Sequence, residues 1–173
     1  MPWTAPKTWT QTFVDEADLN THVRDNLLWL RSASEVAFAY RNTTGPLIPA
    51  ATWTAQGLDA EGADTYGGFA APNPYIQVPS AGIVRASYAI WFLNYTGTGL
   101  LGGRLTQLTS GAVVITSFGF SYGNEVAPSA AATAMFAVSA GDLIRLEAYS
   151  NTSGTQASIG IGSQLMVEMV RPN

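Results

Sequence analysis

Residues 138–150 contain a tight turn followed by a run of alternating side chains. Gly141 and Asp142 mark the turn, because glycine accepts the left-handed backbone of turns and aspartate bonds nearby amides. The residues after the turn alternate between two faces, as the side chains of a β-strand do. A further turn at 151–154 predicts that residues 155–159 pair with this strand, forming a hairpin at the centre of an all-β sandwich. One face of the strand carries Ile144, Leu146 and Ala148, and the other carries Leu143, Arg145, Glu147 and Tyr149.

Similar strands, separated by turn signals, recur from about residue 51 onwards. About eight short strands, with turns roughly every 8–12 residues, are typical of a sandwich or jelly roll. Residues 57–74 show little periodicity and are expected to form a long loop, a kind of segment that is often functional. The expected strands cover residues 52–54, 75–78, 83–92, 104–108, 112–120, 133–138, 143–150 and 164–170.

The beginning of the chain has a different character. Two prolines in residues 1–14 disfavour helix and predict an extended arm. Residues 15–39 follow with apolar side chains at helical spacing, which predicts one α-helix. Residues 42–49 read as a linker with a Gly-Pro turn. The expected fold is therefore mainly β, with an arm and helix over residues 1–45 for attachment or oligomerisation and a jelly-roll β-sandwich over residues 46–173.

The arm and the helix carry more apolar surface than we expect them to bury alone. Charged residues make up only 12% of the chain, about half the usual share, so part of the surface is expected to be covered by other chains. Exposed aromatic side chains usually mark such contacts. The alternative is that the arm folds back over its own sandwich and that the helix packs on its own subunit. We predict an attachment interface made by Trp3, Trp9, Phe13, Leu19, Val23, Trp29 and Leu30.

Composition excludes several kinds of function. The chain has no cysteine, which rules out disulfides and cysteine-based zinc sites. Its net charge of −4 argues against a nucleic-acid partner, because phosphate binding needs clustered lysine and arginine. No stretch approaches the roughly 18 apolar residues of a membrane span, so we expect no membrane partner. The first residues also lack the pattern of a signal peptide.

The sequence offers no catalytic constellation, so we expect neither an enzyme nor a cofactor. His22 is the only histidine, and it lacks the partners that a metal site or a catalytic triad requires. Asp59, Glu61 and Asp64 form the densest acidic cluster; their oxygens could hold calcium, although a solvated loop is the more ordinary interpretation. Tyrosines could supply a sugar-stacking surface, although aromatics on strands more often belong to a core or an interface. These tyrosines are Tyr66, Tyr75, Tyr88, Tyr95, Tyr122 and Tyr149.

Two stretches of the sandwich resemble a known family. Residues 75–92 contain a strand, a Pro-Ser-Ala-Gly turn and a long alternating strand, and residues 138–154 contain the Ala-Gly-Asp corner and a Ser-Gly turn. Both resemble the tumour-necrosis-factor/complement-type jelly roll, and the similarity covers residues 50–171 loosely. Members of that family are typically compact trimers, so the resemblance implies a homotrimer.

The N-terminal part resembles another group of proteins. Segments 2–6 (Pro-Trp-Thr-Ala-Pro) and 19–27 (Leu-Asn-Thr-His-Val-Arg-Asp-Asn-Leu) resemble the start of many tailed-bacteriophage virion proteins, usually called minor tail or decoration proteins. The chain departs from them at residues 13–16, where related starts tend to have a threonine cap. The resemblance implies a structural protein of the virion, attached to capsid or tail proteins through its N-terminal arm.

A second function stays open at the level of sequence, namely a receptor- or glycan-binding head of a tail fibre. In that case the loops over residues 57–74 and 121–132 would contact a glycan on the host surface. The sequence leaves open whether the protein belongs to the head or the tail of the particle.

Overall fold

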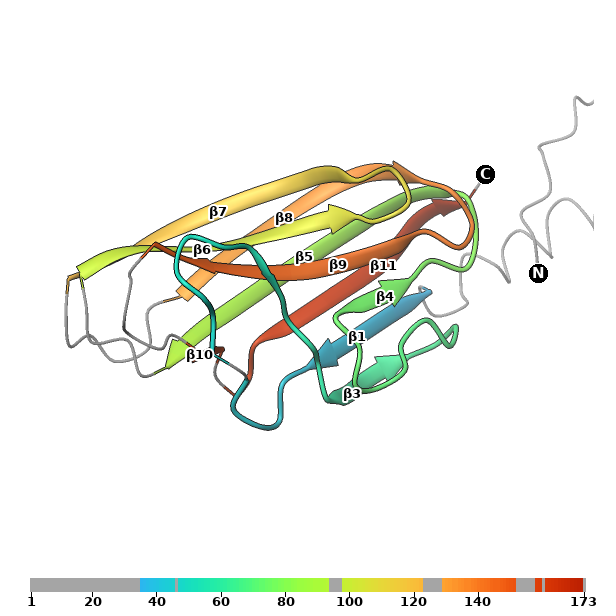
Figure 1. The fold of residues 1–173 in the computed structure, drawn as a ribbon. Helices are drawn as coiled ribbons and strands as arrows, with labels where there is room; N and C mark the ends of the chain where they lie inside the picture. The colour runs from blue at the N-terminus through green and yellow to red at the C-terminus, as the bar shows by residue number, and fades with distance from the viewer. Residues whose placement is uncertain are drawn as a thin grey trace, which may run out of the picture. The chain divides into compact units, whose positions relative to one another are not determined.

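The computed structural model describes residues 35–45, 47–93, 98–122, 129–151, 158–159 and 161–172. These residues form a two-layer β-sandwich whose paired strands run antiparallel, and none of them lies in a helix (Figure 1). In the described part of the chain there is accordingly no helix that could cross a membrane. The mainly β fold class is therefore confirmed for these residues.

The first sheet is organised around its longest strand, β5. This strand pairs with β8 on one side and with β11 on the other, and β11 is followed by β1 and β3. The short β10 pairs with the far end of β5. The strands of this sheet are β1 (Val36–Tyr40), β3 (Ala60–Asp64), β5 (Gly82–Leu93), β8 (Ser129–Val138), β10 (Ser158–Ile159) and β11 (Gln164–Pro172).

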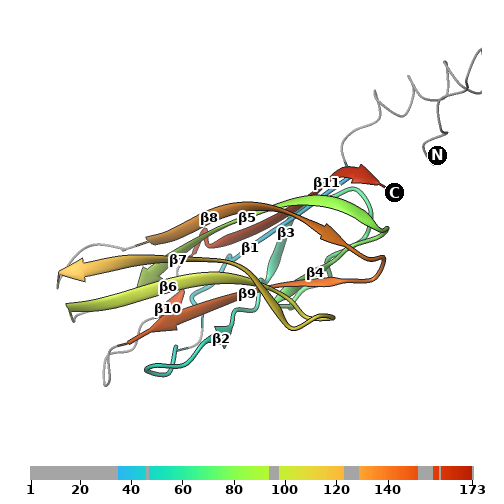
Figure 2. The ribbon, with the colours of Figure 1, turned by 90° about the horizontal axis from the view of Figure 1, so that it is seen from above.

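The second sheet has β9 inside it. Strands β2 and β4 pair with one edge of β9, and β6 pairs with the other edge and continues to β7. Figure 2 shows the two layers, with β8, β5 and β11 in one and β7, β6 and β9 in the other. The strands of this sheet are β2 (Thr54–Ala55), β4 (Tyr75–Gln77), β6 (Thr98–Gln107), β7 (Ala112–Tyr122) and β9 (Leu143–Ser150).

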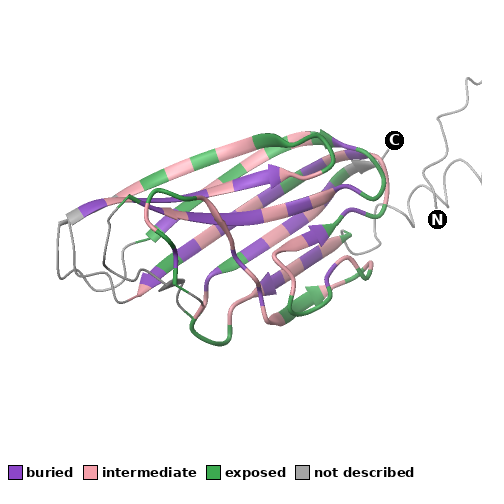
Figure 3. Ribbon diagram, in the orientation of Figure 1, coloured by how far each residue is buried: buried purple, intermediate pink, exposed green. Residues whose placement is uncertain are grey.

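The core lies between the two sheets and follows the alternation of side chains along the strands. Burial changes residue by residue along β5, as the banding in Figure 3 shows. In β9 the predicted alternation is confirmed, because Ile144, Leu146 and Ala148, which were expected to share one face, are all fully buried. Apolar side chains on one face of each sheet thus drive the two layers together, since each fully buried Val, Leu, Ile or Phe contributes roughly 1.5–3 kcal/mol. Those of β5 are Val84, Ala86, Tyr88, Ile90 and Phe92.

Tyr88 links the two sheets by a buried hydrogen-bonded hydroxyl. The hydroxyl donates to the carbonyl of Gly103 on β6, and it accepts a bond of 3.0 Å from the backbone N–H of Ser117 on β7. Burial raises the pKa of Tyr88 above its usual value, although the bonds with Ser117 act in the opposite direction. Tyr88 is therefore a core residue, and it is not available for stacking on a sugar.

The beginning of the sandwich differs from the prediction. Residues 36–40 form β1, so the helix predicted over residues 15–39 is wrong at its C-terminal end. Ala37 and Ala39 are fully buried and alternate with outward-facing neighbours, which is the period of a strand. Five residues are too few to distinguish the period of a helix from that of a strand. Pairing with β11 and β3 makes this segment a strand. The sheet thus includes residues before 46, where we expected the sandwich to begin.

Two further predictions need correction. The segment 57–74 is not a plain loop, because residues 60–64 pair with β1 as β3. The hairpin of residues 143–150 with 155–159 is also wrong, since residues 158–159 pair with β5 in the other sheet. The chain therefore changes sheets after β9, and the neighbours of β9 are strands distant in sequence.

Asp142 closes the turn between β8 and β9, as predicted. Its carboxylate accepts a bond of 2.7 Å from the backbone N–H of Ser139 and another from the side chain of Gln107. Gly141 takes the left-handed backbone of the turn, with φ at 85°. Burial by itself would raise the pKa of Asp142, but the bonds from Ser139, Thr109 and Gln107 outweigh it and hold that pKa below its usual value.

We expect Asp142→Asn to weaken the fold at neutral pH and to matter less in acid. The folded pKa of Asp142 lies below its unfolded value, so the carboxylate contributes stability above about pH 4 that is lost as the pH falls through the folded pKa. Asparagine keeps one oxygen as an acceptor, but its amide NH₂ would replace the other oxygen, so two donors would face each other or one bond would be lost. We expect this to lower the free energy of unfolding by about 1 kcal/mol at pH 7. Urea unfolding at pH 7 and pH 3 measures the difference. A deficit that is the same at both values would contradict this role.

Candidate functional site

The structure leaves part of the predicted site untested. The attachment residues from Trp3 to Leu30 and the single histidine, His22, lie outside the described residues. So do Tyr95 and the side chain of Tyr122. These residues therefore stay predictions.

The acidic cluster does not converge on one point. The carboxylate of Asp59 accepts hydrogen bonds from the backbone N–H groups of Asn42 and Thr43, at 2.5 and 3.2 Å. Asp64 accepts instead from the backbone of residues 66–69, including a bond of 2.8 Å from Phe69 N–H. No group of three acidic or histidine side chains in the described part of the chain could hold a metal ion. The carboxylates therefore order two separate loops.

The electrostatics of Asp59 agree with that structural role. Burial by itself would raise its pKa. Hydrogen bonds from Asn42 and from the hydroxyl and backbone of Thr43, together with the charge of Arg41, outweigh burial and hold the pKa of Asp59 below its usual value. Arg41 lies 3.8 Å from the carboxylate and also bonds the carbonyl of Gly57.

The tyrosines whose side chains are described do not form one surface. Tyr88 is in the core, and Tyr66 is partly buried and packs against the core. Burial, followed by the charges of Asp64 and Glu35, raises the pKa of Tyr66, whose hydroxyl is buried without a hydrogen-bond partner among the residues that the structure describes. Its ring lines a shallow hollow of about 270 Å³ beside the turn at Gly141. Tyr149 alone belongs to the larger aromatic group described below.

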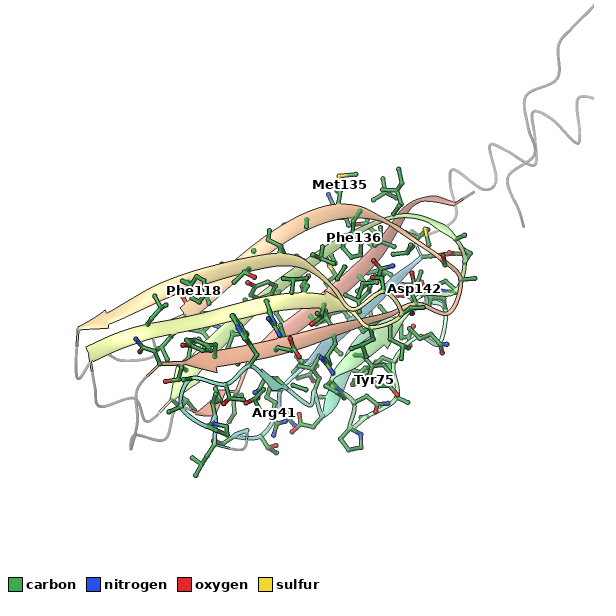
Figure 4. All side chains as sticks on the ribbon, turned by 45° about the horizontal axis from the view of Figure 1, so that its top comes forward. Arg41, Tyr75, Phe118, Met135, Phe136 and Asp142 are labelled. Carbon is green, nitrogen blue, oxygen red and sulfur yellow. The ribbon has the colours of Figure 1, made fainter. Side chains whose placement is uncertain are left out.

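The outer face of the first sheet, which we call the first-sheet face, is apolar over four neighbouring strands. Met135 is 60% exposed, and Trp91 and Val170 are each 43% exposed. Figure 4 shows Met135 pointing away from the sandwich. An unpaired apolar face of this extent is typical of a protein interface. Its apolar members, which alternate with buried residues, are Val36, Phe38, Tyr40, Ile83, Ala89, Trp91, Ala131, Met135, Ala137, Met166 and Val170.

Charges on this face neutralise each other. Arg85 and Glu168 occupy paired positions on β5 and β11, and Arg85 Nε donates to the carboxylate at 3.0 Å. On its other neighbouring strand, β8, Arg85 pairs with Met135, so the exposed Met135 side chain lies next to the ion pair across the sheet. The charges of Arg85 and Glu168 on this face are therefore paired with each other.

A second group lies on the opposite side of the sandwich, on the outer face of the second sheet. We call it the Arg–aromatic cluster, and its centre is Gly102 on β6. Gly102 pairs with Tyr149 on β9 and with Phe118 on β7. A Cβ atom at Gly102 would lie 2.7 Å from the Phe118 ring and 3.1 Å from that of Trp53, so only glycine lets the rings meet there. The cluster consists of Trp53, Arg104, Phe118, Arg145, Glu147 and Tyr149.

The three rings of the cluster are in mutual contact. The centroid of the Trp53 ring lies 5.0 Å from that of Tyr149 and 5.9 Å from that of Phe118. Phe118 and Tyr149 meet edge to face, with centroids 6.3 Å apart. Trp53 and Tyr149 are half-buried, whereas Phe118 is 53% exposed, so its ring is the one offered to solvent.

Next to the rings lies a shared ion pair. The side chain of Glu147 is only 4% exposed, and it accepts bonds of 2.5 Å from Arg104 and 2.5 Å from Arg145. The hydroxyl of Thr106 donates a third bond at 2.9 Å. The Arg104 guanidinium lies 4.4 Å from the centroid of the Trp53 ring, a cation–π contact. Two arginines share one carboxylate, so the cluster carries net positive charge.

Sequence reasoning found only part of this cluster. It placed Arg145, Glu147 and Tyr149 correctly together on one face of a strand. It missed Arg104 and Trp53, which are brought to β9 by strand pairing rather than by spacing in the sequence. The available signal was a pair of opposite charges on one strand face, which gave no hint that Glu147 is buried.

Comparison with known proteins rests on structure. No family model matches the chain, and no curated protein matches it in sequence. The globular domain of zebrafish complement 1qA protein is similar with a TM-score of 0.62 and 13% identity, over 80% of this chain and 99% of that one. Eiger TNF from S. frugiperda is similar with a TM-score of 0.55 and 16% identity, over 81% and 94% of the two chains.

Murine APRIL at pH 5.0 gives a TM-score of 0.53 with 15% identity, over 80% of this chain and 100% of that chain. At such low identities the likeness concerns the fold alone. It agrees with the resemblance seen in residues 75–92 and 138–154. The described residues of this chain thus have the TNF/C1q-like jelly-roll fold.

Proposed function

We propose that this chain is a structural virion protein of a tailed bacteriophage, either a capsid decoration or a tail-associated protein. A homotrimeric TNF/C1q-like jelly roll would form its head, and the N-terminal arm and helix would attach it to capsid or tail proteins. The phage-like segments at residues 2–6 and 19–27 support the virion role. The observation that most supports the proposed homotrimer is the apolar first-sheet face.

Self-association accounts for this face better than exposure to water does. The face spans β8, β5, β11 and β1, and its paired charges need no external partner. Its small residues on β8, such as Ala131 and Ala137, leave it flat enough for a second copy to approach closely. Apolar surface removed from water contributes about 25 cal/mol per Å², so covering it favours assembly. The low share of charged residues, 12%, fits the same assembly.

Removing residues 1–34 is expected to leave a folded, self-associating jelly roll that no longer binds phage particles. The deletion must stop there, because β1 begins at Val36 and pairs with both β11 and β3. Co-sedimentation with particles that lack the protein measures attachment, and light scattering measures the oligomeric state. Full-length protein with an exposed surface substitution, Val113→Ala, is the control. Particle binding by the truncated chain at the level of full-length protein would contradict attachment through residues 1–34.

A receptor- or glycan-binding head of a tail fibre is the second candidate. The Arg–aromatic cluster favours it, because an exposed ring beside a cation is suited to binding a ligand. Copy number separates the two candidates. Quantitative mass spectrometry of virions should find many copies of a decoration protein and only a handful of a tail-fibre head.

A further inference from the structure

We infer that the Arg–aromatic cluster binds an acidic saccharide, that is, a sugar that carries a carboxylate. This assignment deepens the glycan-binding form of the proposed function. The loops at 57–74 and 121–132 were the expected contacts for a glycan, whereas the cluster lies on the strands and edge of the second sheet. Three properties of the cluster lead to this ligand class: its charge, its exposed ring and its position.

The charge is unusual within the chain. Among the arginines whose side chains are described, Arg41 pairs with Asp59 and Arg85 with Glu168, each with its own carboxylate. Arg104 and Arg145 instead share Glu147. Their side chains are 23% and 30% exposed, so a ligand can reach both. A chain of net charge −4 thus keeps a local excess of positive charge at one place.

The hydrogen-bonding capacity of these arginines is also only partly used. Arg104 engages Glu147 through Nε, which leaves its two Nη groups without a hydrogen bond among the described residues. Arg145 engages Glu147 through Nη2, and its Nε is buried without a partner among the described residues, so the free donors that a ligand can reach are those of Arg104. The paired donors of a guanidinium fit a carboxylate, which can accept two parallel bonds. A ligand carboxylate would supply the acceptors that Glu147 alone does not.

The exposed ring explains why a saccharide suits the site. Trp53 contacts both the Arg104 guanidinium, at 4.4 Å from the ring centroid, and the Phe118 ring, at 5.9 Å between centroids. A sugar ring presents a face of C–H groups that packs on an aromatic ring, and its carboxylate substituent would point to the guanidinium. A neutral sugar would leave the excess charge without a partner. Binding of nucleic acid disagrees with the overall negative charge.

The position of the cluster keeps it available in the assembly. It lies on the outer face of the second sheet, whereas the first-sheet face is on the other side of the sandwich. Self-association through the first-sheet face therefore leaves the cluster open. Each subunit of a homotrimer would carry one such site, and repeated weak sites on one head increase the avidity for a polymer.

Binding of short uronate and sialate oligosaccharides to the full-length protein tests the assignment. Each acidic sugar is compared with its methyl ester, which has the same ring without the charge. Titration calorimetry and saturation-transfer NMR should detect at least one acidic member, with its ester at least about tenfold weaker, since charge-assisted bonds are lost. Added salt should weaken the acidic sugar more than its ester.

Variants separate the ring from the charge. We expect Phe118→Ala to weaken binding about tenfold, the scale of one lost stacking contact. Val113→Ala is the matched control, because Val113 is 48% exposed on the same strand, and it should change affinity less than about twofold. Arg104→Lys keeps the charge but not the paired donors and should lie between wild type and Phe118→Ala. Thermal unfolding and light scattering verify that each variant is folded and assembled.

Several results would overturn the assignment. Failure of every acidic sugar to bind, or equal binding of an acidic sugar and its methyl ester, would exclude a site that recognises the carboxylate. Displacement by acetate or inorganic phosphate as effective as by the sugar would indicate a simple anion site. Binding of a polyglutamate peptide in place of sugars would indicate an acidic protein partner. Particle binding by Phe118→Ala is measured separately, so failure here leaves the virion role intact.

Discussion

Met135→Asp is expected to convert the proposed homotrimer into a folded monomer. Met135 is 60% exposed in the protomer, so the aspartate should cost the isolated fold little, within about 0.5 kcal/mol. In the assembly the same side chain would be buried against apolar neighbours, and an unpaired buried carboxylate costs several kcal/mol at every copy of the interface. Sedimentation equilibrium and light scattering, with circular dichroism to verify folding, measure the outcome.

The matched control for this prediction is Val113→Asp. Val113 is 48% exposed and lies on β7 of the second sheet, so a charge there should leave the oligomeric state unchanged. The same pair of substitutions in the chain that lacks residues 1–34 separates the first-sheet face from any contribution of the N-terminal part. A Met135→Asp protein that remains trimeric in both backgrounds would exclude the first-sheet face as the interface.

Glu147→Ala is expected to destabilise the protomer by about 3 kcal/mol, the lower end of the range for breaking a buried ion pair. The substitution leaves Arg104 and Arg145 close together without their shared carboxylate, and it leaves the Thr106 hydroxyl without its acceptor. Partial exposure of both guanidinium groups keeps the cost from being larger. Urea unfolding in the monomeric Met135→Asp background measures this cost without the contribution of assembly.

Glu168→Ala is the matched control for the buried pair. Glu168 also accepts a hydrogen bond from an arginine on the neighbouring strand, but that arginine, Arg85, has a side chain that is 49% exposed. Exposed ion pairs contribute about 0–1 kcal/mol, so this variant should lose far less stability than Glu147→Ala. Equal losses in the two variants would mean that the burial of Glu147 does not strengthen its network.

Local patterns in the chain were sufficient for most of the longer strands and for the alternation of their side chains. Ile144, Leu146 and Ala148 are buried as their alternation predicted, and Asp142 closes its turn as its neighbours Ala140 and Gly141 predicted. These features depend on residues two or three positions apart, so the sequence contains them directly. The number and spacing of such strands indicated a sandwich or jelly roll, and the resemblance of residues 75–92 and 138–154 to a known family pointed to the jelly roll.

Partners distant in the sequence were decided by tertiary structure alone. Residues 36–40 became a strand through pairing with β11 and β3, and residues 158–159 joined β5 instead of their neighbour β9. The contact of Arg104 with Glu147 joins residues 43 positions apart, and it involves a carboxylate whose burial the alternation did not predict. Burial and charge at such a site depend on which strands lie side by side, and that choice minimises the exposed apolar surface of the whole sandwich rather than of any one segment.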